Sequence, residues 1–407
     1  MSNPVQDSSS SSSSSSGGVD TNNDNHNKRQ KHNPQESQSQ PLIPGLPDHI
    51  AQLCLSHVNN PLLLFSVSHS WRRLLYSPSF PPFLSLYAIF YSASETDEFN
   101  THPIKVLAFD PLCSRWSNLP PPPPDPPLHL LLRHPAFISR NLPIQSVSAA
   151  GQLILLAATD STFLPALSRP LCFDPQSISW AFGPPIDTPR RWCVAGVCAG
   201  AVYMASGMGS HFSYDVAKSV AKWDLNTKKF SVDGGGSAGS EAKMAVDWKW
   251  EKLKGLKNGR FCRDAIDAVG WRGKLCMGTF LAKEGFVYDM EDTWQKMPEG
   301  MAAGWRGPAA TMDEEVMYVV EEAKGVLSKY DPEKDHWEDV IESERLEGAR
   351  QISASGGRVC VVCKGGRIVV VDAVAPAPER VWVVDTPPGL EPVSVHILPR
   401  ISRSAPE

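Results

Sequence analysis

Between residues 84 and 400 the chain alternates strand-length apolar runs with turns rich in Gly, Pro and Asp, and helical periodicity is scarce there. One unit recurs along this stretch. An apolar residue, an aromatic residue and an Asp are followed about six positions later by a second aromatic residue, as in Phe173-Asp174 and Trp180. The Asp residues of the successive copies are Asp110, Asp174, Asp224, Asp289, Asp331 and, in a degenerate copy without the first aromatic residue, Asp372.

A second pattern precedes most copies, namely two apolar strands joined by a tight turn. The turns fall at Gly151, Gly200, Gly273 and Gly356-Gly357, with Asp313-Glu314 in place of glycine in one copy. Each unit therefore predicts a four-stranded antiparallel sheet, whose Trp is large enough to cover the neighbouring sheet. Such sheets bury their faces only by stacking around an axis, so the fold expected is mainly β, a propeller of about six blades.

The two ends of the repeat region predict how the ring closes. The first unit lacks a glycine hairpin, and the C-terminus supplies a spare alternating strand with Val393, Val395 and Ile397. We expect this strand to join the first blade, because closure removes the exposed sheet edges. The third unit carries an insertion at 234–259, and its second aromatic residue is read as Phe230.

Residues 42–83 have a different hydrophobic pattern, in which apolar residues recur at helical spacing. Pro47 follows Leu46 and suits the first turn of a helix, and Ile50 continues the apolar face. Ser68 is placed to cap a later helix that carries Trp71. The pattern predicts three short helices in about 40 residues. So small a unit has little room for a core, and its apolar face indicates a partner.

This segment resembles an F-box. The elements that carry the resemblance are Leu46-Pro47, Ile50 to Leu55, Val67-Ser68, Trp71-Arg72 with Leu74, and Ser77-Pro78 with Phe80. In that family the motif docks on the Skp-type adaptor of cullin–RING ubiquitin ligases. The resemblance implies that adaptor contacts or their immediate support come from Leu46, Pro47, Ile50, Val67 and Trp71. The alternative is an ordinary helical cap on the next domain.

The repeats resemble kelch repeats in their aromatic-Asp-Pro turns, the Trp about six residues later and a following Leu-Pro such as Leu119-Pro120. They depart from that pattern because the paired glycines survive only at Gly356-Gly357. The whole chain resembles plant-type F-box/kelch-repeat proteins. The resemblance implies the substrate-recognition subunit of a Skp–cullin–F-box ubiquitin ligase, with no catalytic residue, cofactor or metal of its own. Two alternatives remain open, a kelch scaffold outside ubiquitination and a propeller enzyme similar to kelch-type copper oxidases.

Four segments follow from these patterns. Residues 1–41 are rich in Ser, Asn and Gln and are expected to be disordered, since they bury too little apolar area to offset chain entropy. Residues 42–83 form the helical F-box-like module, 84–400 the kelch-type propeller and 401–407 a C-terminal tail. A basic cluster at 28–32 is either a weak nuclear-import patch or a solvated charge cluster.

Basic residues recur just before the first strand of several units, and their similar register predicts a place near one rim or the central channel. The candidates for a target-binding face are Arg191, Arg263, Arg306 and Arg350. One interpretation is a cationic face that grips an acidic or phosphorylated partner protein. The other is a set of inter-blade salt bridges and hydrogen bonds to carbonyl groups.

Composition narrows the possible partners and compartments. The 407 residues carry a net charge of −5 and 20% charged residues, so no global field favours nucleic acid. No apolar run reaches the roughly 20 residues of a membrane span. With no secretory signal visible, the nine cysteines are expected to be reduced thiols of the nucleus or cytoplasm. The glycine-rich stretch Gly234–Gly239 reads as a loop, and Cys360 and Cys363 read as buried small hydrophobic residues.

Overall fold

The computed structural model describes the chain with several gaps. The described residues are 41–58, 64, 67–68, 70–71, 74, 84–92, 94, 101–110, 114–123, 128–130, 144–226, 248–256, 265–279, 285–289, 293–374 and 380–401. The tail at 1–40, the glycine-rich stretch Gly234–Gly239 and Arg263 lie outside them. The chain divides between Pro41 and Leu42, and every element described below belongs to the second unit.

The described strands form six antiparallel sheets, and the first unites the two ends of the repeat region. Its order is β25 (Leu390–Pro399), β1 (Leu84–Ser92), β2 (His102–Asp110) and β3 (Arg115–Asn118), with β4 (His129–Leu130) also paired to β2. β25 and β1 pair over their whole length, with Val395 opposite Ala88. The C-terminal strand thus completes the first blade, as the alternating pattern predicts.

Each of the other five sheets takes four consecutive strands. Blade 2 holds β5 (Gln145–Ala149), β6 (Gln152–Ala157), β7 (Leu171–Asp174) and β8 (Ser179–Phe182); blade 3 holds β9 (Val194–Cys198), β10 (Ala201–Ala205), β11 (Val220–Asp224) and β12 (Glu251–Leu253). Blade 4 holds β13 (Ala265–Trp271), β14 (Lys274–Thr279), β15 (Gly285–Asp289) and β16 (Thr293–Lys296). Blade 5 holds β17 (Ala309–Met312), β18 (Val316–Glu321), β19 (Val326–Asp331) and β20 (His336–Glu342); blade 6 holds β21 (Ala349–Ser355), β22 (Arg358–Cys363), β23 (Arg367–Asp372) and β24 (Arg380–Val384).

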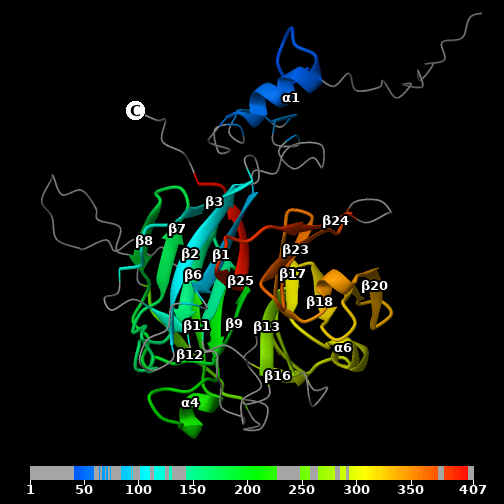
Figure 1. Cartoon of the computed structure of the whole chain (residues 1–407). Coiled ribbons are helices and arrows are strands. Elements are labelled where there is room, and N and C mark those ends of the chain that lie inside the picture. Colours follow the sequence, from blue (N-terminus) through cyan, green and yellow to red (C-terminus); the bar gives the residue numbers. More distant parts are fainter. Residues whose placement is uncertain are drawn as a thin grey trace, which may run out of the picture. The chain divides into compact units, whose positions relative to one another are not determined.

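The six inner strands form a closed ring. Each of β25, β5, β9, β13, β17 and β21 contacts the next, and β21 contacts β25 again. Neighbours run in the same direction, since Gly196 of β9 faces Ala268 of β13 while Gly270 faces Val197 further along. The fold is a six-bladed β-propeller (Figure 1), which confirms the predicted class and settles the blade count.

The tight turns between the first two strands of blades 2 to 6 share one backbone conformation. Both central residues have positive φ, as in Ala199 (50°) and Gly200 (72°), or Asp313 (53°) and Glu314 (57°). This conformation matches the right-handed twist of the flanking strands. Glycine is therefore favoured at the second position but is not required, which explains why blade 5 turns without it.

In blades 1, 2, 4 and 5 the recurrent Trp joins the blade to the one before it. Phe173 on β7 lies opposite Trp180 on β8, with ring centroids 5.1 Å apart. The Trp180 Nε1 donates a hydrogen bond of 2.8 Å to the carbonyl oxygen of Pro120, after the outer strand of blade 1. Equivalent bonds run from Trp116 to Asp385 (2.7 Å), from Trp294 to Lys254 (2.9 Å) and from Trp337 to Met301 (3.1 Å).

The third blade differs from the sequence expectation. Phe230 lies outside the described residues, and the outer strand that pairs with β11 is β12. Trp250, immediately before β12, packs 5.8 Å from the buried Trp223 ring and donates to the carbonyl oxygen of Pro184 at 3.3 Å. Trp250 thus makes in blade 3 the contacts that Trp180 makes in blade 2. The range 234–259 predicted as an insertion contains β12, so the extra residues are only those between β11 and β12.

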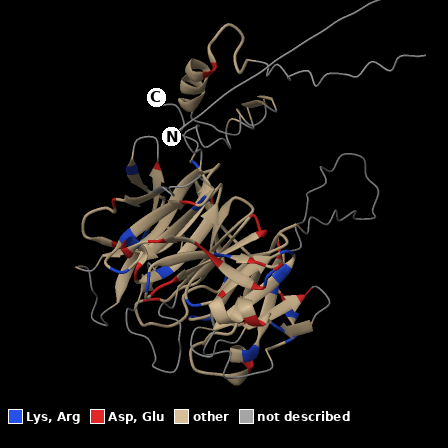
Figure 2. Ribbon diagram, turned by 90° about the vertical axis from the view of Figure 1, so that its right-hand side faces the viewer, with Lys and Arg blue, Asp and Glu red and all other residues tan. Residues whose placement is uncertain are grey.

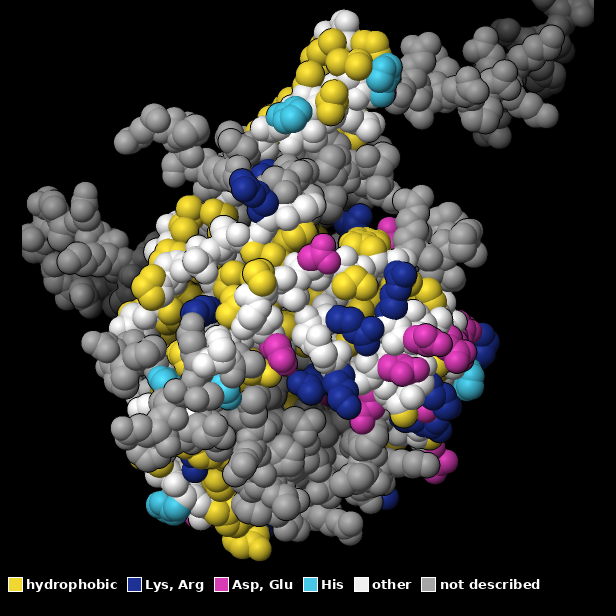
Figure 3. All heavy atoms as spheres, viewed as in Figure 1, with side chains coloured by type: hydrophobic (Ala, Val, Ile, Leu, Met, Phe, Trp, Pro, Cys, Tyr) yellow, Lys and Arg dark blue, Asp and Glu magenta, His cyan; other side chains and the backbone are white. Residues whose placement is uncertain are grey.

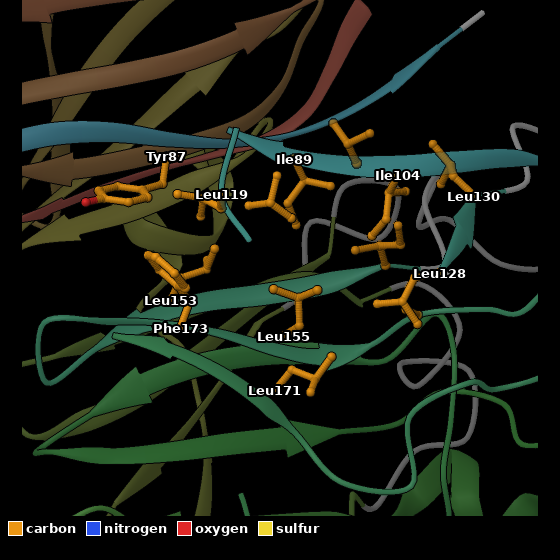
Figure 4. Close-up of a cluster of buried hydrophobic side chains, with 14 of the residues drawn as sticks. Tyr87, Ile89, Ile104, Leu119, Leu128, Leu130, Leu153, Leu155, Leu171 and Phe173 are labelled. Atoms are coloured by element: carbon orange, nitrogen blue, oxygen red, sulfur yellow. The ribbon is translucent and has the colours of Figure 1, made fainter. Parts of the chain in front are cut away.

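The core lies between neighbouring blades. Figure 4 shows one cluster, in which Tyr87 and Ile89 of blade 1 face Leu153, Leu155 and other side chains of blade 2. Cys360 and Cys363 are both buried on β22 and point to different clusters, as residues three apart on a strand must. Short helices α4 (Tyr214–Lys218) and α6 (Glu299–Gly304) and the 3-10 turn η1 (Glu344–Leu346) lie in connections between strands. No helix of the described residues is long and apolar enough to cross a membrane.

Candidate functional site

The helical segment has a small core of its own. Its first helix, α1 (Asp48–Ser56), begins after Pro47, and the buried Leu55 packs with Leu64 and Leu74. Trp71 is half-buried against this core, and its Nε1 donates a hydrogen bond of 2.7 Å to the carbonyl oxygen of Leu42. This hydrogen bond ties Trp71 to the residues that precede α1. Trp71 therefore supports the structure of the helical segment.

The other face of this segment is apolar and exposed. Leu46 and Ile50 are each 37% exposed, and Leu53 and Val67 are each 58% exposed. Pro47 is exposed beside them. Figure 3 shows yellow hydrophobic atoms over this segment, whose helix α1 carries Asp48 as its sole charged residue. Leu53 was not among the sequence candidates, although its helical spacing from Ile50 points to the same face.

The direction of the inner strands gives the propeller two distinct sides. All inner strands begin on one side, which we call the loop face. It is formed by the connections 158–170, 183–193, 206–219, 297–308 and 343–348, and α4 marks it in Figure 1. Leu84, at the start of β1, pairs with Pro399 at the end of β25, so the chain enters the ring on the opposite side.

The candidate arginines occupy the loop face but differ in their surroundings. Arg191, in the connection before β9, is buried, whereas Arg350 at the start of β21 is exposed. Arg306 is exposed and pairs with Glu321 at 3.4 Å. Arg263 lies outside the described residues. The predicted register thus brings the three described arginines to one side without joining them into one patch, and their role in target binding stays a prediction.

Charge is mixed over the propeller. Figure 2 shows Lys and Arg interspersed with Asp and Glu around the described blades. Three or more His, Cys, Asp or Glu side chains do not gather as a metal site anywhere in the described part of the chain. The arrangement offers an exposed apolar face on the helical segment and a loop-built surface on the propeller.

A short helical segment with an exposed apolar face, followed in the sequence by a closed kelch-type propeller, defines the class of F-box propeller proteins. Comparison with known proteins supports this. The chain is 51% identical over 377 residues to the F-box/kelch-repeat protein SKIP25 of Arabidopsis thaliana, an alignment that covers 90% of this chain and 92% of that protein. It is 24% identical over 363 residues to the F-box protein AFR of the same plant, covering 83% and 85% respectively. No family model matches the chain. The chain belongs to the F-box/kelch-repeat family.

Proposed function

We propose that this protein is the substrate-recognition subunit of a Skp–cullin–F-box ubiquitin ligase, acting in the nucleus or cytoplasm. The helical segment holds a Skp-type adaptor, and through it the cullin and RING subunits, while the propeller holds the target protein. Ubiquitin transfer then gains from effective concentration, so the subunit needs no active site of its own.

One observation carries the adaptor half of this proposal. The helical segment buries Leu55, Leu64 and Leu74 in its own core and still exposes Ile50, Leu53 and Val67. An exposed apolar face on a domain that small is typical of a protein–protein interface. Family membership supports the same role, because F-box proteins as a class bind Skp-type adaptors.

The direct test is capture of a purified Skp-type adaptor by the full chain. The double variant Pro47→Ala with Ile50→Ala should lose most adaptor binding, because Ile50 supplies apolar contact area and Pro47 sets the start of α1. The matched control is His57→Ala, an exposed side chain just after α1. Unchanged capture by a folded double variant contradicts the proposal, and so does failure of the wild-type chain to bind adaptor.

A further inference from the structure

Arg191 holds its guanidinium against two aromatic rings on the loop face, which also contact each other edge-on with centroids 5.1 Å apart. Its Cζ lies 4.5 Å from the ring centroid of Phe163 and 5.1 Å from that of Trp192. The residue is 6% exposed. Burial lowers the pKa of Arg191, and the charge of Asp160 opposes that shift. The site therefore contains a largely desolvated cation stacked on π-faces, an arrangement that cation–π attraction stabilises only in part.

The hydrogen-bonding capacity of this cation is unused. Its Nε is buried without a partner, and its terminal nitrogens donate no hydrogen bond within the described part of the chain. The preceding Arg190 is a direct contrast, because its Nη1 donates to the Ser206 carbonyl at 3.0 Å and to Ser219 Oγ at 2.7 Å. Buried arginines are normally paired in this second way. Arg190 is thus a structural residue, whereas Arg191 keeps the N–H donors of its two terminal nitrogens available.

The carboxylate of Asp160 does not neutralise Arg191. Asp160 acts on it only through its field, and no ion pair joins the two side chains in the described structure. The Asp160 Oδ1 instead accepts hydrogen bonds from Thr162 N (2.9 Å), Thr162 Oγ1 (2.8 Å) and Leu164 N (2.9 Å). Its carboxylate is therefore used to shape the turn that presents Phe163.

The backbone around Arg191 is held in a strained form. Arg191 and Met208 exchange two backbone hydrogen bonds of 2.9 Å. Phe163 and Trp192, whose rings the guanidinium contacts, have φ values of 67° and 51°. Bulky residues rarely adopt the left-handed region, and such strain persists only where the surrounding structure enforces it. The fold thus fixes both rings and the cation in one place before any partner arrives.

Exposed apolar side chains lie on the same loops. Leu164 follows Phe163 directly, and Phe212 lies four residues beyond Met208. Both are more than 40% exposed, and Phe212 packs edge-on against the exposed Tyr214 at 5.3 Å. A protein segment that reaches Arg191 therefore meets apolar surface beside it, as at the centre of a typical interface.

We propose that Arg191 is the anion-binding centre of the target surface, where an anionic side chain of a bound peptide segment accepts its free N–H groups while apolar neighbours in that segment pack on Leu164 and Phe212. This inference rests on the proposed function. The ligand chemistry is a carboxylate or a phosphate, because both accept the fork of donors that an arginine presents. A neutral segment leaves the cation unpaired and desolvated.

The test uses the full-length protein and three pools of fluorescent 13-residue peptides, randomised except for a central Glu, phosphoserine or Gln. The wild-type chain should retain the Glu pool, the phosphoserine pool or both about tenfold more than the Gln pool, the factor expected for charge-assisted hydrogen bonds in a desolvated site. Equal retention of all three pools by the wild-type chain overturns the proposal. The ratio of the two anionic pools identifies the source of the charge.

Variants then locate the effect. Arg191→Met, which keeps an apolar stem against the two rings, should abolish the preference. Arg272→Met is the matched control, since Arg272 is an exposed, ion-paired cation that also contacts a Trp ring but lies in the turn between β13 and β14 on the side opposite the loop face, and it should keep the preference. Loss of the preference in both variants, or in neither, contradicts a specific role for Arg191.

A gain-of-affinity variant keeps the test independent of folding losses. Asp160→Asn retains the acceptor that holds the Phe163 turn but removes the opposing charge, so it should raise retention of the anionic pools two- to fivefold without changing the Gln pool. No gain in a folded Asp160→Asn chain contradicts the proposal. Adaptor capture is measured on the same preparations: adaptor binding without peptide preference overturns only this inference, and peptide preference without adaptor binding overturns only the proposed function.

Discussion

The Tyr87 hydroxyl donates a hydrogen bond of 2.7 Å to the carbonyl oxygen of Pro399, across 312 residues of sequence. Tyr87 lies on the first strand of the propeller and Pro399 ends the last. Next to this bond, Arg400 forms a largely buried ion pair with Asp110 on β2. These contacts fasten the C-terminal strand to the first blade beyond the pairing of β25 with β1.

Removing the Tyr87 hydroxyl should weaken the closure. Tyr87→Phe keeps the ring in the blade 1–blade 2 core but leaves the Pro399 carbonyl without this donor, so the free energy of unfolding should fall by about 1–2 kcal/mol. Denaturant unfolding followed by Trp fluorescence measures the change. Tyr214→Phe, at an exposed position, should stay within about 0.5 kcal/mol of wild type. Equal effects of the two variants would show that the closing bond contributes nothing.

The recurrent Trp should contribute most to the free energy of unfolding where its Nε1 donates a hydrogen bond to the preceding blade. Trp180→Phe preserves an aromatic ring beside Phe173 but removes the donor to Pro120, so we expect a loss of about 1–2 kcal/mol. In blade 6 the place of Trp180 is taken by Val381, opposite Val371, and the next residue, Trp382, lies opposite Val370. Trp382 is 38% exposed and makes no inter-blade hydrogen bond among the described residues. Trp382→Phe should therefore cost less than about 0.5 kcal/mol. A larger loss for Trp382→Phe than for Trp180→Phe contradicts the inter-blade role.

Substitutions on two adjacent faces of α1 should separate an effect on adaptor binding from an effect on folding. Leu53 is exposed, so Leu53→Asp should abolish adaptor capture while leaving the helical segment folded. Leu55 is buried with Leu64 and Leu74, so Leu55→Ala should destabilise the segment by about 2–3 kcal/mol and weaken capture only through unfolding. Capture at graded temperatures distinguishes the two, because only the Leu55→Ala loss should recover on mild cooling. Wild-type capture by Leu53→Asp would remove α1 from the interface.

The burial of His396 predicts that the stability of the protein depends on pH. His396 is buried between β25 and β5, with Ser146 and Ser148 hydroxyls at 2.8 and 3.0 Å, and burial lowers its pKa from 6.5 to about 4. Below about pH 6.5 the unfolded chain takes up a proton that the folded chain refuses until about pH 4, so the free energy of unfolding falls over that window. Between pH 7 and 5 this loss is about 2 kcal/mol. His396→Gln should lose that much less than wild type.

A second titratable group, a half-buried carboxyl, changes stability in the opposite direction, so the effect of His396 is measured as a difference. Burial raises the pKa of Asp267 from 3.8 to about 7, so its contribution to stability is lost as pH rises through that range. The wild-type curve sums both groups, and the difference between wild type and His396→Gln isolates the histidine. The control His57→Gln, at an exposed site, should follow the wild-type curve. Parallel curves for wild type and His396→Gln would contradict the assignment.

Much of the propeller was predictable because its repeats carry local chemistry. The Asp that ends a third strand turns the chain by accepting a hydrogen bond from an amide two residues on, as Asp174 does from Gln176 N at 2.9 Å and Asp331 from Glu333 N at 2.9 Å. The alternating strand around Val395 had to bury one face, so its union with the first blade followed from pattern alone.

What the sequence did not reveal depends on contacts between segments far apart. The insertion in blade 3 separates β11 from β12, so a local spacing rule selected Phe230 and missed Trp250. The same limit applies to the arginines. Arg190 and Arg191 are adjacent and chemically identical, yet hydrogen bonds to 206 and 219 occupy one of them and leave the other unpaired. Only the folded loops distinguish them.

The ring closure also fixes the order in which the protein is completed during translation. The helical segment and β1 leave the ribosome early, but β1 receives its inner partner only after about 300 further residues, which take roughly 15–60 s to synthesise at about 5–20 residues per second. Throughout that interval the inner edge of β1 offers unpaired amides and carbonyls to any passing strand. A chain that ends before residue 390 has a complete helical segment while its ring stays open, so nascent-chain chaperones have an exposed strand edge to cover.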